Sequence, residues 1–364
     1  MMSVYLAPMC GITDHIFRTL CYEQGCDLAY TEMISAMGWL CAPEQRATKV
    51  LMKRGKGEPK LILQLFGRDP EVVAEAACRI AQLGLYDGID LNMGCPAKKI
   101  APSGEGCGLM RTPETAKAMM QKTVKACGLP VSVKMRLGYD REHINVLDFA
   151  RMAEDAGICS ITVHGRTREQ QYSGRADWDM IAKVKQSVRI PVIGNGDIFS
   201  SDDAVKYQRA SGTDGVMIGR GAMGNPWIFR QLSVGLGEIS PGENVTDIAG
   251  EQSGTSADRK KIRLEINRGK RETADNEEIL TARSTGDDPG NCGVPGTQEV
   301  MEMILRHARL VIEYSGEAAG MRQMRKHIAW YTAGMKHSSS LRREANTLET
   351  YAQLEELLRS YEGS

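Results

Sequence analysis

The chain has 364 residues, of which 42% are hydrophobic and 25% are charged. These proportions are ordinary for a globular protein and exclude a wholly disordered, collagen-like or coiled-coil chain. The 46 lysines and arginines balance the 46 aspartates and glutamates. The protein is therefore not coated in positive charge for nucleic acid, although a local basic patch is compatible with this balance.

Three further features bear on location and metal content. No run of about 18 apolar residues occurs, so we expect no membrane-spanning segment. The first residues have no basic start and reach Asp14 early, which argues against a signal peptide. The ten cysteines form no CxxC pair and show no metal-ligand spacing, so we expect reduced thiols, no bound metal and a cytoplasmic location.

Residues 1–232 alternate short β-branched runs with longer helical patterns. Strands that alternate with helices indicate a parallel sheet, and eight such units over this length are typical of an α/β fold, the (β/α)8 TIM barrel. An open doubly wound sheet is the alternative, but it would require a glycine-rich turn after the first strand. The predicted strands are Val4–Pro8, Leu28–Met33, Leu61–Phe66, Gly88–Asn92, Val131–Met135, Ser160–His164, Pro191–Asn195 and Asp214–Ile218.

Helices are predicted between these strands over residues 70–84, 113–128, 144–157 and 201–212. The first two have the strongest end signals. Asp69 and Thr112 stand where a capping side chain is preferred, and a proline follows each of them at the first helical position. A glycine just past the last turn then closes each helix.

Beyond residue 232 the composition changes twice. Residues 233–297 are rich in Gly, Ser, Thr, Asp and Pro. They cannot bury enough surface to offset their ordering entropy, so we expect a mobile insertion or linker. Residues 298–364 return to a helical period and predict a small all-helical C-terminal domain of three or so helices. One apolar face would contain Val300, Met303, Ile304, Leu310, Val311 and Tyr314.

Polar residues stand at nearly every predicted strand end, and in a TIM barrel the active site lies at the carboxyl ends of the strands. Each residue alone has a structural explanation, but together they exceed what core packing needs and indicate a ligand site. The residues are Pro8-Met9-Cys10, Glu32, Gln64, Asn92-Met93-Gly94-Cys95, Lys134-Met135-Arg136, His164, Asn195-Gly196-Asp197 and Gly219-Arg220.

The loops after the last two strands read GNGDI and GRGAMGNP. Barrels commonly bind phosphate in these two loops through glycine N–H groups, and Arg220 would add a charge. The alternative is that these glycines only make tight turns. Lys134 at a barrel mouth is costly to bury without an anionic partner, which an electron-rich ring or a phosphate would supply. His164 alone is as consistent with a structural hydrogen bond as with ligand binding.

Cys95 is the most informative thiol, because it follows a strand within NMGCP on a loop and not on an apolar face. A free thiol with a pKa of about 8.5 is mostly protonated at neutral pH and can act as a general acid. With a lowered pKa it could act as a nucleophile instead. Many cysteines are only small buried hydrophobes, so a structural role also stays open.

Eight motifs together resemble the dihydrouridine synthase family, and their sequences are most similar to its bacterial B-type branch. The resemblance covers most of the chain and breaks at residues 233–297. The motifs are APMCGITDHIFR at 7–18, LQLFG at 63–67, DLNMGCPAKK at 90–99, VKMRLG at 133–138, ITVHGRTREQQYSGRADW at 161–178, VIGNGDI at 192–198, VMIGRGAMGNPWIF at 216–229 and MRQMRKHIAWYTAG at 321–334.

The resemblance implies an FMN-dependent enzyme that uses NADPH to reduce specific uridines of tRNA to 5,6-dihydrouridine and requires no protein partner. Reduced FMN would give hydride to C6 of the uracil, and Cys95 would give a proton to C5. Pro8, Met9 and Cys10 are implied to lie under the flavin ring, and Gln64 and Lys134 to contact it. The implied phosphate and ribityl contacts are His164, Asn195, Gly196, Asp197, Gly219 and Arg220.

A basic segment supports an RNA substrate despite the zero net charge. Residues 306–343 contain eight lysines and arginines against two acidic residues. Arg322, Arg325 and Lys326 have the spacing of one helix face. A solvated face is the alternative, but the concentration of charge favours RNA binding by the C-terminal domain. Lys98 and Lys99, near Cys95, are further candidates for contact with RNA phosphate.

Two other functions stay open at this point. A flavin barrel could reduce a small-molecule enone or dihydropyrimidine, although such a substrate would not need the basic helices. The chain could also be a non-catalytic RNA-binding protein, although the intact Cys95, Lys134 and glycine loops argue against a decayed site. Residues 100–106 read IAPSGEG, which is less basic than in B-type relatives, so the grip of this loop on RNA would be weaker.

Overall fold

The computed structural model describes residues 2–235, 293–336 and 338–362. The chain divides into two compact units, Met1–Leu236 and Gly237–Ser364. Of the segment expected to be an insertion or linker, residues 236–292 lie outside the described residues. Among the helices described, none is long and apolar enough to cross a membrane.

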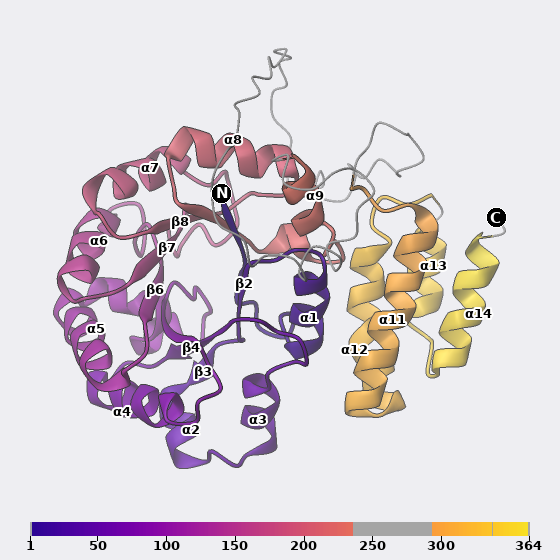
Figure 1. Ribbon diagram of the computed structural model, residues 1–364, viewed down its shortest axis with the longest axis horizontal. Coiled ribbons are helices and arrows are strands. Elements are labelled where there is room, and N and C mark those ends of the chain that lie inside the picture. The colour runs from indigo at the N-terminus through magenta and orange to yellow at the C-terminus, as the bar shows by residue number, and fades with distance from the viewer. Residues whose placement is uncertain (1, 236–292, 337, 363–364) are drawn as a thin grey trace, which may run out of the picture. The chain divides into compact units, whose positions relative to one another are not determined.

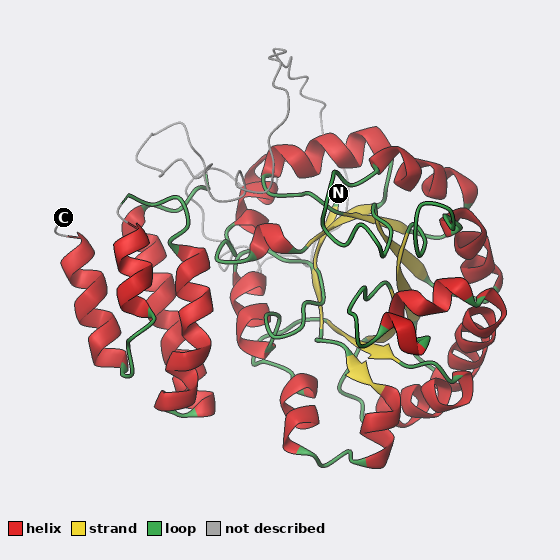
Figure 2. Ribbon diagram, turned by 180° about the vertical axis from the view of Figure 1, so that it is seen from behind, coloured by secondary structure: helices red, strands yellow, loops and turns green. Residues whose placement is uncertain are grey.

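The first unit is a closed barrel of parallel strands, which confirms the predicted fold (Figure 2). Neighbouring strands pair in chain order, and pairing of β2 with β4 and of β1 with β9 closes the ring. The strands are β1 Ser3–Leu6, β2 Leu28–Tyr30, β4 Leu61–Phe66, β5 Gly88–Met93, β6 Val131–Arg136, β7 Ser160–His164, β8 Val192–Asn195 and β9 Gly215–Ile218. Their Val, Ile and Leu side chains are buried in one core together with apolar side chains of the surrounding helices.

Helices surround the strands, and α4 to α8 follow one another around the ring (Figure 1). The barrel helices are α1 His15–Glu23, α2 Ala36–Cys41, α3 Arg46–Met52, α4 Pro70–Ala81, α5 Pro113–Cys127, α6 Val146–Asp155, α7 Trp178–Ser187, α8 Ser201–Ser211 and α9 Ile228–Gly235. Short 3-10 turns η1 Ala101–Ser103, η2 Gly106–Arg111 and η3 Arg220–Ala222 lie in the connecting loops. Helix α9 continues past residue 232, where the composition predicted the barrel to end.

Two local predictions need correction. Asp69 caps α4 as expected, because its carboxylate accepts the N–H groups of Glu71 and Val72. Thr112 does not cap α5, because its hydroxyl donates to the carbonyl oxygen of Leu109 in the preceding turn η2. The second predicted strand is also split: β2 ends at Tyr30, and the chain re-enters the sheet only at β3 (Ile34–Ser35), which pairs with β4.

The strand register places the polar residues of neighbouring strands at the same level. Gln64 of β4 lies opposite Asp90 of β5. Two residues further along β5, Asn92 lies opposite Lys134 of β6. His164 at the end of β7 lies opposite Asn195 at the end of β8. Because all strands are parallel, these residues collect at the carboxyl edge of the barrel.

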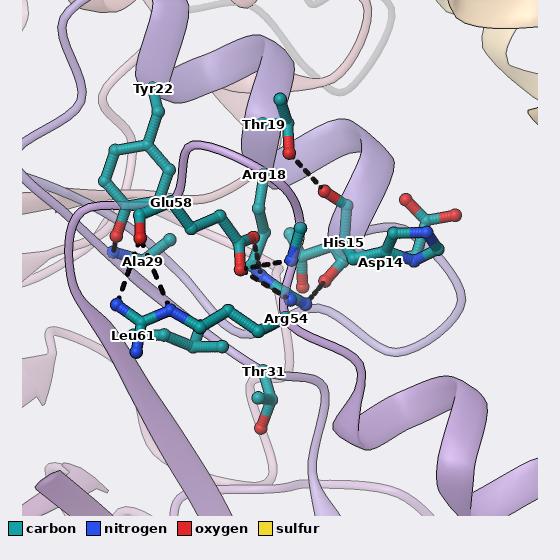
Figure 3. A network of polar contacts seen from close by, with 12 residues as sticks. Asp14, His15, Arg18, Thr19, Tyr22, Ala29, Thr31, Arg54, Glu58 and Leu61 are labelled. Carbon is teal, nitrogen blue, oxygen red and sulfur yellow. Dashed lines mark hydrogen bonds and ion pairs between the residues drawn. The ribbon is translucent and has the colours of Figure 1, made fainter. Parts of the chain in front are cut away.

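A buried ion pair connects α1 with the loop that precedes β4 (Figure 3). Nε of Arg18 donates to Oε1 of Glu58 at 2.7 Å, and both side chains are almost fully shielded from solvent. The same guanidinium donates to the carbonyl oxygens of Thr13 and Lys53. The hydroxyl of Thr13 accepts the N–H of Met9 at 2.9 Å. Buried charges need such complete pairing, and the network anchors the turn that follows β1.

The described part of the second unit is helical. Its described helices are α11 Thr297–Ser315, α12 Glu317–Tyr331, α13 Ser338–Ala345 and α14 Tyr351–Glu362. Val300, Ile304 and Val311 are buried along α11 as the periodicity predicted. Tyr314 is not part of that buried face, because 36% of it is exposed near the end of the helix.

Candidate active site

The carboxyl edge of the barrel encloses a cavity of about 610 Å³. Every residue that the resemblance assigned to the cofactor or to catalysis lines it, whereas Glu32, Met93 and Met135 of the predicted strand-end set do not. The structure thus brings together side chains from seven strands or the loops that follow them, while their individual roles stay predictions. These lining residues are Pro8, Met9, Cys10, Gln64, Cys95, Lys134, His164, Asn195, Gly196, Asp197, Gly219 and Arg220.

Lys134 occupies the cavity wall with a fixed partner. Its Nζ donates to Oδ1 of Asn195 at 3.0 Å, and the amide of Asn195 is itself oriented because its Nδ2 donates to the carbonyl oxygen of Met217 at 2.7 Å. Burial, with the nearby charge of Arg136, lowers the pKa of Lys134 to about 8. The lysine is therefore charged at neutral pH but close to titration, because the charge of the nearby Asp90 offsets only part of the effect of burial.

Two arginines share one carboxylate beside the last two strands. Oδ2 of Asp197 accepts from Arg166 at 2.7 Å, and Oδ1 accepts from Arg220 at 3.1 Å. Arg166 is almost fully buried and was not selected by the sequence, because it stands in the loop after β7 and not at a strand end. The trio carries a net positive charge and suits an anion. Asp197 itself acts there as the counter-ion that holds the two guanidinium groups.

The glycines of these loops are required by close contacts. Gly196 has φ +129°, and a Cβ there would lie 2.6 Å from Cβ of Ala176. A Cβ on Gly221 would lie 2.2 Å from the carbonyl oxygen of Ile198. The tight-turn explanation therefore holds for both positions, and it does not compete with anion binding, since the same turns bring Arg220 to the cavity.

His164 is buried at the end of β7, with Nε2 lying 3.4 Å from Nη1 of Arg166. Burial lowers its pKa well below the ordinary value, and the charges of Arg136, Lys134, Arg166 and Arg220 add to this effect. The imidazole is therefore neutral, and four cations surround it. Such a concentration of positive charge around one cavity favours an anionic ligand.

Cys95 is half-buried on the cavity wall, and its backbone is fixed on both sides. Oδ1 of Asn92 accepts the N–H of Cys95 at 2.9 Å and that of Gly94 at 3.1 Å. Nε of Arg136 donates to the carbonyl oxygen of Gly94, and the N–H of Cys107 donates to that of Cys95. Burial raises the pKa of the Cys95 thiol. A thiol that stays protonated suits a general acid and not a nucleophile.

Two neighbouring thiols differ from Cys95. Cys107 is fully buried, and burial raises its pKa to about 12. Cys10 is exposed and lines the same cavity, and burial of its sulfur with the nearby charge of Glu32 raises its pKa. Cys95 combines access to the cavity with a backbone held on both sides by hydrogen bonds.

Tyr172 lines the cavity but does not stand at a predicted strand end. It lies in the loop after β7, is half exposed, and has its ring centroid 4.6 Å from the guanidinium carbon of Arg220. Phe199, in the loop after β8, lies 5.4 Å from the same guanidinium. Aromatic residues inside the motif at 161–178 are the signal that could have indicated this part of the site.

The predicted RNA contacts fall on both units. Lys98 and Lys99 are exposed in the loop that follows Cys95. Arg322 is exposed on α12, but Arg325 is partly buried, and its Nη2 donates to the carbonyl oxygen of Leu348 at 3.3 Å. Arg325 therefore also connects α12 with the segment before α14. The predicted contacts with RNA stay predictions.

Known proteins match this arrangement over nearly the whole chain. The profile of the family described as dihydrouridine synthase matches residues 5–251 and 271–362. A probable tRNA-dihydrouridine synthase of Rickettsia conorii is 35% identical over 346 residues, 95% of this chain and 89% of that protein. The tRNA-dihydrouridine synthase B of Shewanella oneidensis is 34% identical over 359 residues, 99% of this chain and 95% of that protein.

Among solved structures, histamine dehydrogenase from Rhizobium sp. 4-9 superposes with a TM-score of 0.50 at 14% identity. The match covers 65% of this chain and 46% of that chain, and it concerns the fold alone. Two of the relatives are named tRNA-dihydrouridine synthase B, which agrees with the resemblance of the motifs to the B-type branch. With the profile match over both units, they show that the chain belongs to the dihydrouridine synthase family.

Proposed function

We propose that this protein reduces specific uridines of tRNA to 5,6-dihydrouridine at the barrel mouth, with FMN as bound cofactor and NADPH as electron donor. The observation that carries the proposal is a thiol with a raised pKa, Cys95, in the same cavity as the cationic Lys134 and Arg220. Membership of the dihydrouridine synthase family supports the same chemistry. A tRNA substrate would place the reaction in the cytoplasm.

The residues of the cavity fit an FMN molecule. The cavity volume of about 610 Å³ is within the ordinary range for cofactor sites. Arg220, which lines the cavity, would bind the phosphate, and the buried Arg166 would add positive charge behind it, since their shared Asp197 neutralises only one of the two charges. Lys134, whose hydrogen-bond partner is the neutral amide of Asn195, would lie beside the ring and favour its anionic reduced form.

When bound, FMN reduced by NADPH supplies a hydride for C6 of the uracil. The protein then supplies the proton that C5 needs. The S–H bond of Cys95 breaks as the C5–H bond forms, and the thiolate is later reprotonated from solvent. Arg136 and Asn92, through their hydrogen bonds to the loop, keep this thiol at the cavity. Proton transfer requires near contact, so the reaction needs this placement as well as the acidity of the thiol.

The barrel would carry out the reaction, and the helical unit would bind the tRNA. A uridine within folded tRNA must leave its stack to reach an enclosed cavity. Lys98 and Lys99 would contact phosphates beside the extruded base, and the basic residues of α12 would bind the body of the tRNA. We therefore assign catalysis to residues 1–232 and tRNA binding to residues 298–364.

The direct test is incubation of the purified protein with NADPH and unmodified tRNA, followed by mass analysis of the nucleosides. The expected result is a uridine derivative heavier by two hydrogen atoms. The alternative, a flavin barrel for a small-molecule enone or dihydropyrimidine, predicts NADPH consumption with such a substrate and none with tRNA. That outcome would overturn the proposal, as would a folded protein that cannot be reconstituted with FMN.

A further inference from the structure

A chain of hydrogen bonds runs beneath the cavity from a buried carboxylate to the loop of Cys95. Asp90 of β5 is fully buried. Its Oδ1 accepts from the hydroxyl of Ser132 at 2.6 Å, and its Oδ2 accepts from Nε2 of Gln64 at 2.7 Å. Oε1 of Gln64 accepts from Nδ2 of Asn92 at 2.9 Å.

The carboxylate sets the direction of this chain. An ionised carboxylate only accepts hydrogen bonds, so Gln64 must turn its NH₂ group toward Asp90. The oxygen of Gln64 then faces Asn92 and selects the NH₂ group of that side chain. The oxygen of Asn92 is left facing the loop, where it accepts the N–H groups of Gly94 and Cys95. Reversal of either amide would bring two donors or two acceptors together.

We propose that Asp90 is a positioning residue of the reaction, which orients the amides of Gln64 and Asn92 and thereby holds Cys95 at the cavity. Its effect on uridine reduction rests on the proposed function, whereas its hold on Cys95 is a property of the protein alone. No contact of Asp90 with a substrate is needed.

The burial of Asp90 is difficult to explain by packing alone. Burial raises the pKa of Asp90 to about 6, so the folded protein keeps a carboxylate where the charge is disfavoured. A neutral amide of the same shape would be easier to bury, but either of its ends could face Gln64, and the direction would be lost. On the other side of the cavity a backbone carbonyl does the same work: Met217 orients Asn195, whose oxygen then faces Lys134.

The test begins with Asp90→Asn in the full-length protein, with and without added FMN. The rate at which iodoacetamide alkylates Cys95 is measured by peptide mass analysis, with Cys159 of the same sample, which is exposed and does not line the cavity, as reference. We expect alkylation of Cys95 relative to Cys159 to rise about tenfold, the usual scale for loosening a buried hydrogen bond. Dihydrouridine formation should fall by a similar factor, while NADPH still reduces the flavin.

A second substitution distinguishes direction from simple structural loss. Adding Gln64→Glu to Asp90→Asn puts the carboxylate at position 64, where it can accept from both neighbouring amides and restore the direction at Asn92. Protection of Cys95 should return to within about twofold of the wild type. Ser132→Ala is the matched control, because it removes the other bond to Asp90 without reversing any amide, and it should change alkylation by no more than about twofold.

Gln64→Met cuts the chain without a charge and decides the question if Asp90→Asn does not fold. Wild-type protection of Cys95 in either variant, or no rescue by the double substitution, would overturn the positioning role. If the wild type forms no dihydrouridine but the variants show the expected changes in Cys95 alkylation, the proposed function is overturned and the positioning role is kept. If the wild type forms dihydrouridine but Cys95 alkylation is unchanged in the variants, the positioning role is overturned and the proposed function is kept.

Discussion

The barrel mouth and the helical unit both concentrate positive charge, but they hold it in different ways. At the mouth, Arg166 and Arg220 share a carboxylate and Lys134 has a fixed amide partner. On α12, Arg322 is exposed to solvent. Charges fixed around a cavity act at short range with little screening, whereas exposed charges act through solvent and weaken with salt. Substitutions at the mouth should therefore change chemistry, and those on the helices RNA affinity.

The largest effect is expected at the mouth from Cys95→Ala. Dihydrouridine formation should fall by about 10²–10⁴-fold, the usual contribution of a general acid. FMN binding and flavin reduction by NADPH should persist, because neither requires the thiol. The two half-reactions are measured separately, by flavin absorbance and by nucleoside mass analysis. Cys95→Ser should fail as well, since a hydroxyl is a far weaker acid.

The matched control for Cys95 is Cys159→Ala. Cys159 is exposed on the barrel and does not line the cavity. Cys107 is a poorer control, because it is buried and its N–H contacts Cys95. Near wild-type uridine reduction in Cys95→Ala would show that the acid has been wrongly assigned.

The next largest effect is expected from Arg220→Ala, also at the mouth. Only Arg166 would then face Asp197, so the local charge falls from positive to neutral. FMN should bind roughly 10- to 100-fold more weakly, the scale of a lost charge-assisted hydrogen bond. Quenching of flavin fluorescence measures the dissociation constant. Arg209→Ala, at an exposed position of α8, is the control, and equal weakening in both variants would contradict a phosphate contact.

A pH series tests Lys134 without any substitution. Its lowered pKa of about 8 means that the charge is lost as pH rises through that value. Uridine reduction should then fall, approaching about tenfold per pH unit. Between pH 8 and the ordinary pKa of a lysine, the folded state binds fewer protons than the unfolded state. In this range Lys134 therefore makes the free energy of unfolding rise with pH. Lys134→Arg should keep its charge and move the decline to higher pH.

The melting temperature, recorded at each pH, separates the two explanations of such a decline. Loss of activity with a melting temperature that does not fall agrees with titration of Lys134. A parallel fall of both quantities would instead indicate unfolding and remove the evidence for this lysine.

The smallest effect is expected in the helical unit. Arg322→Glu should weaken tRNA binding a few-fold and reduce the slope of log affinity against log salt by about 0.7–0.9, the value of one phosphate contact. Flavin reduction should not change. Arg359→Glu, at an exposed position of α14, is the control of equal charge change. A loss of flavin reduction in Arg322→Glu would mean that the two regions are not separate in function.

Arg325 and Lys326 were equally strong candidates in the sequence, but the structure makes Arg325 a poor test. Its guanidinium donates to the carbonyl oxygen of Leu348, so a charge reversal there would disturb the helical unit as well as any RNA contact. The helical spacing of Arg322, Arg325 and Lys326 indicated a shared face, but not which of them is free of internal contacts.

Local sequence signals were reliable where the physics is local. Asp69 followed by a proline predicted the start of α4, because a capping bond involves only the next few residues. Runs of β-branched residues predicted the strands, because burial on both faces removes polar side chains. Thr112 had the same signal as Asp69 but bonds to Leu109 instead, because the preceding turn η2 offers its hydroxyl a nearer partner.

The composition and order of strands and helices by themselves determined the barrel, and with it the edge at which Cys95, Lys134 and Arg220 meet. A parallel closed sheet leaves no other place for its strand ends. Only the tertiary structure decided the partners: Arg166 for Asp197, Asn195 for Lys134, and the chain from Asp90 to Cys95. These contacts join segments distant in sequence, and their geometry depends on register and side-chain orientation, which no local pattern encodes.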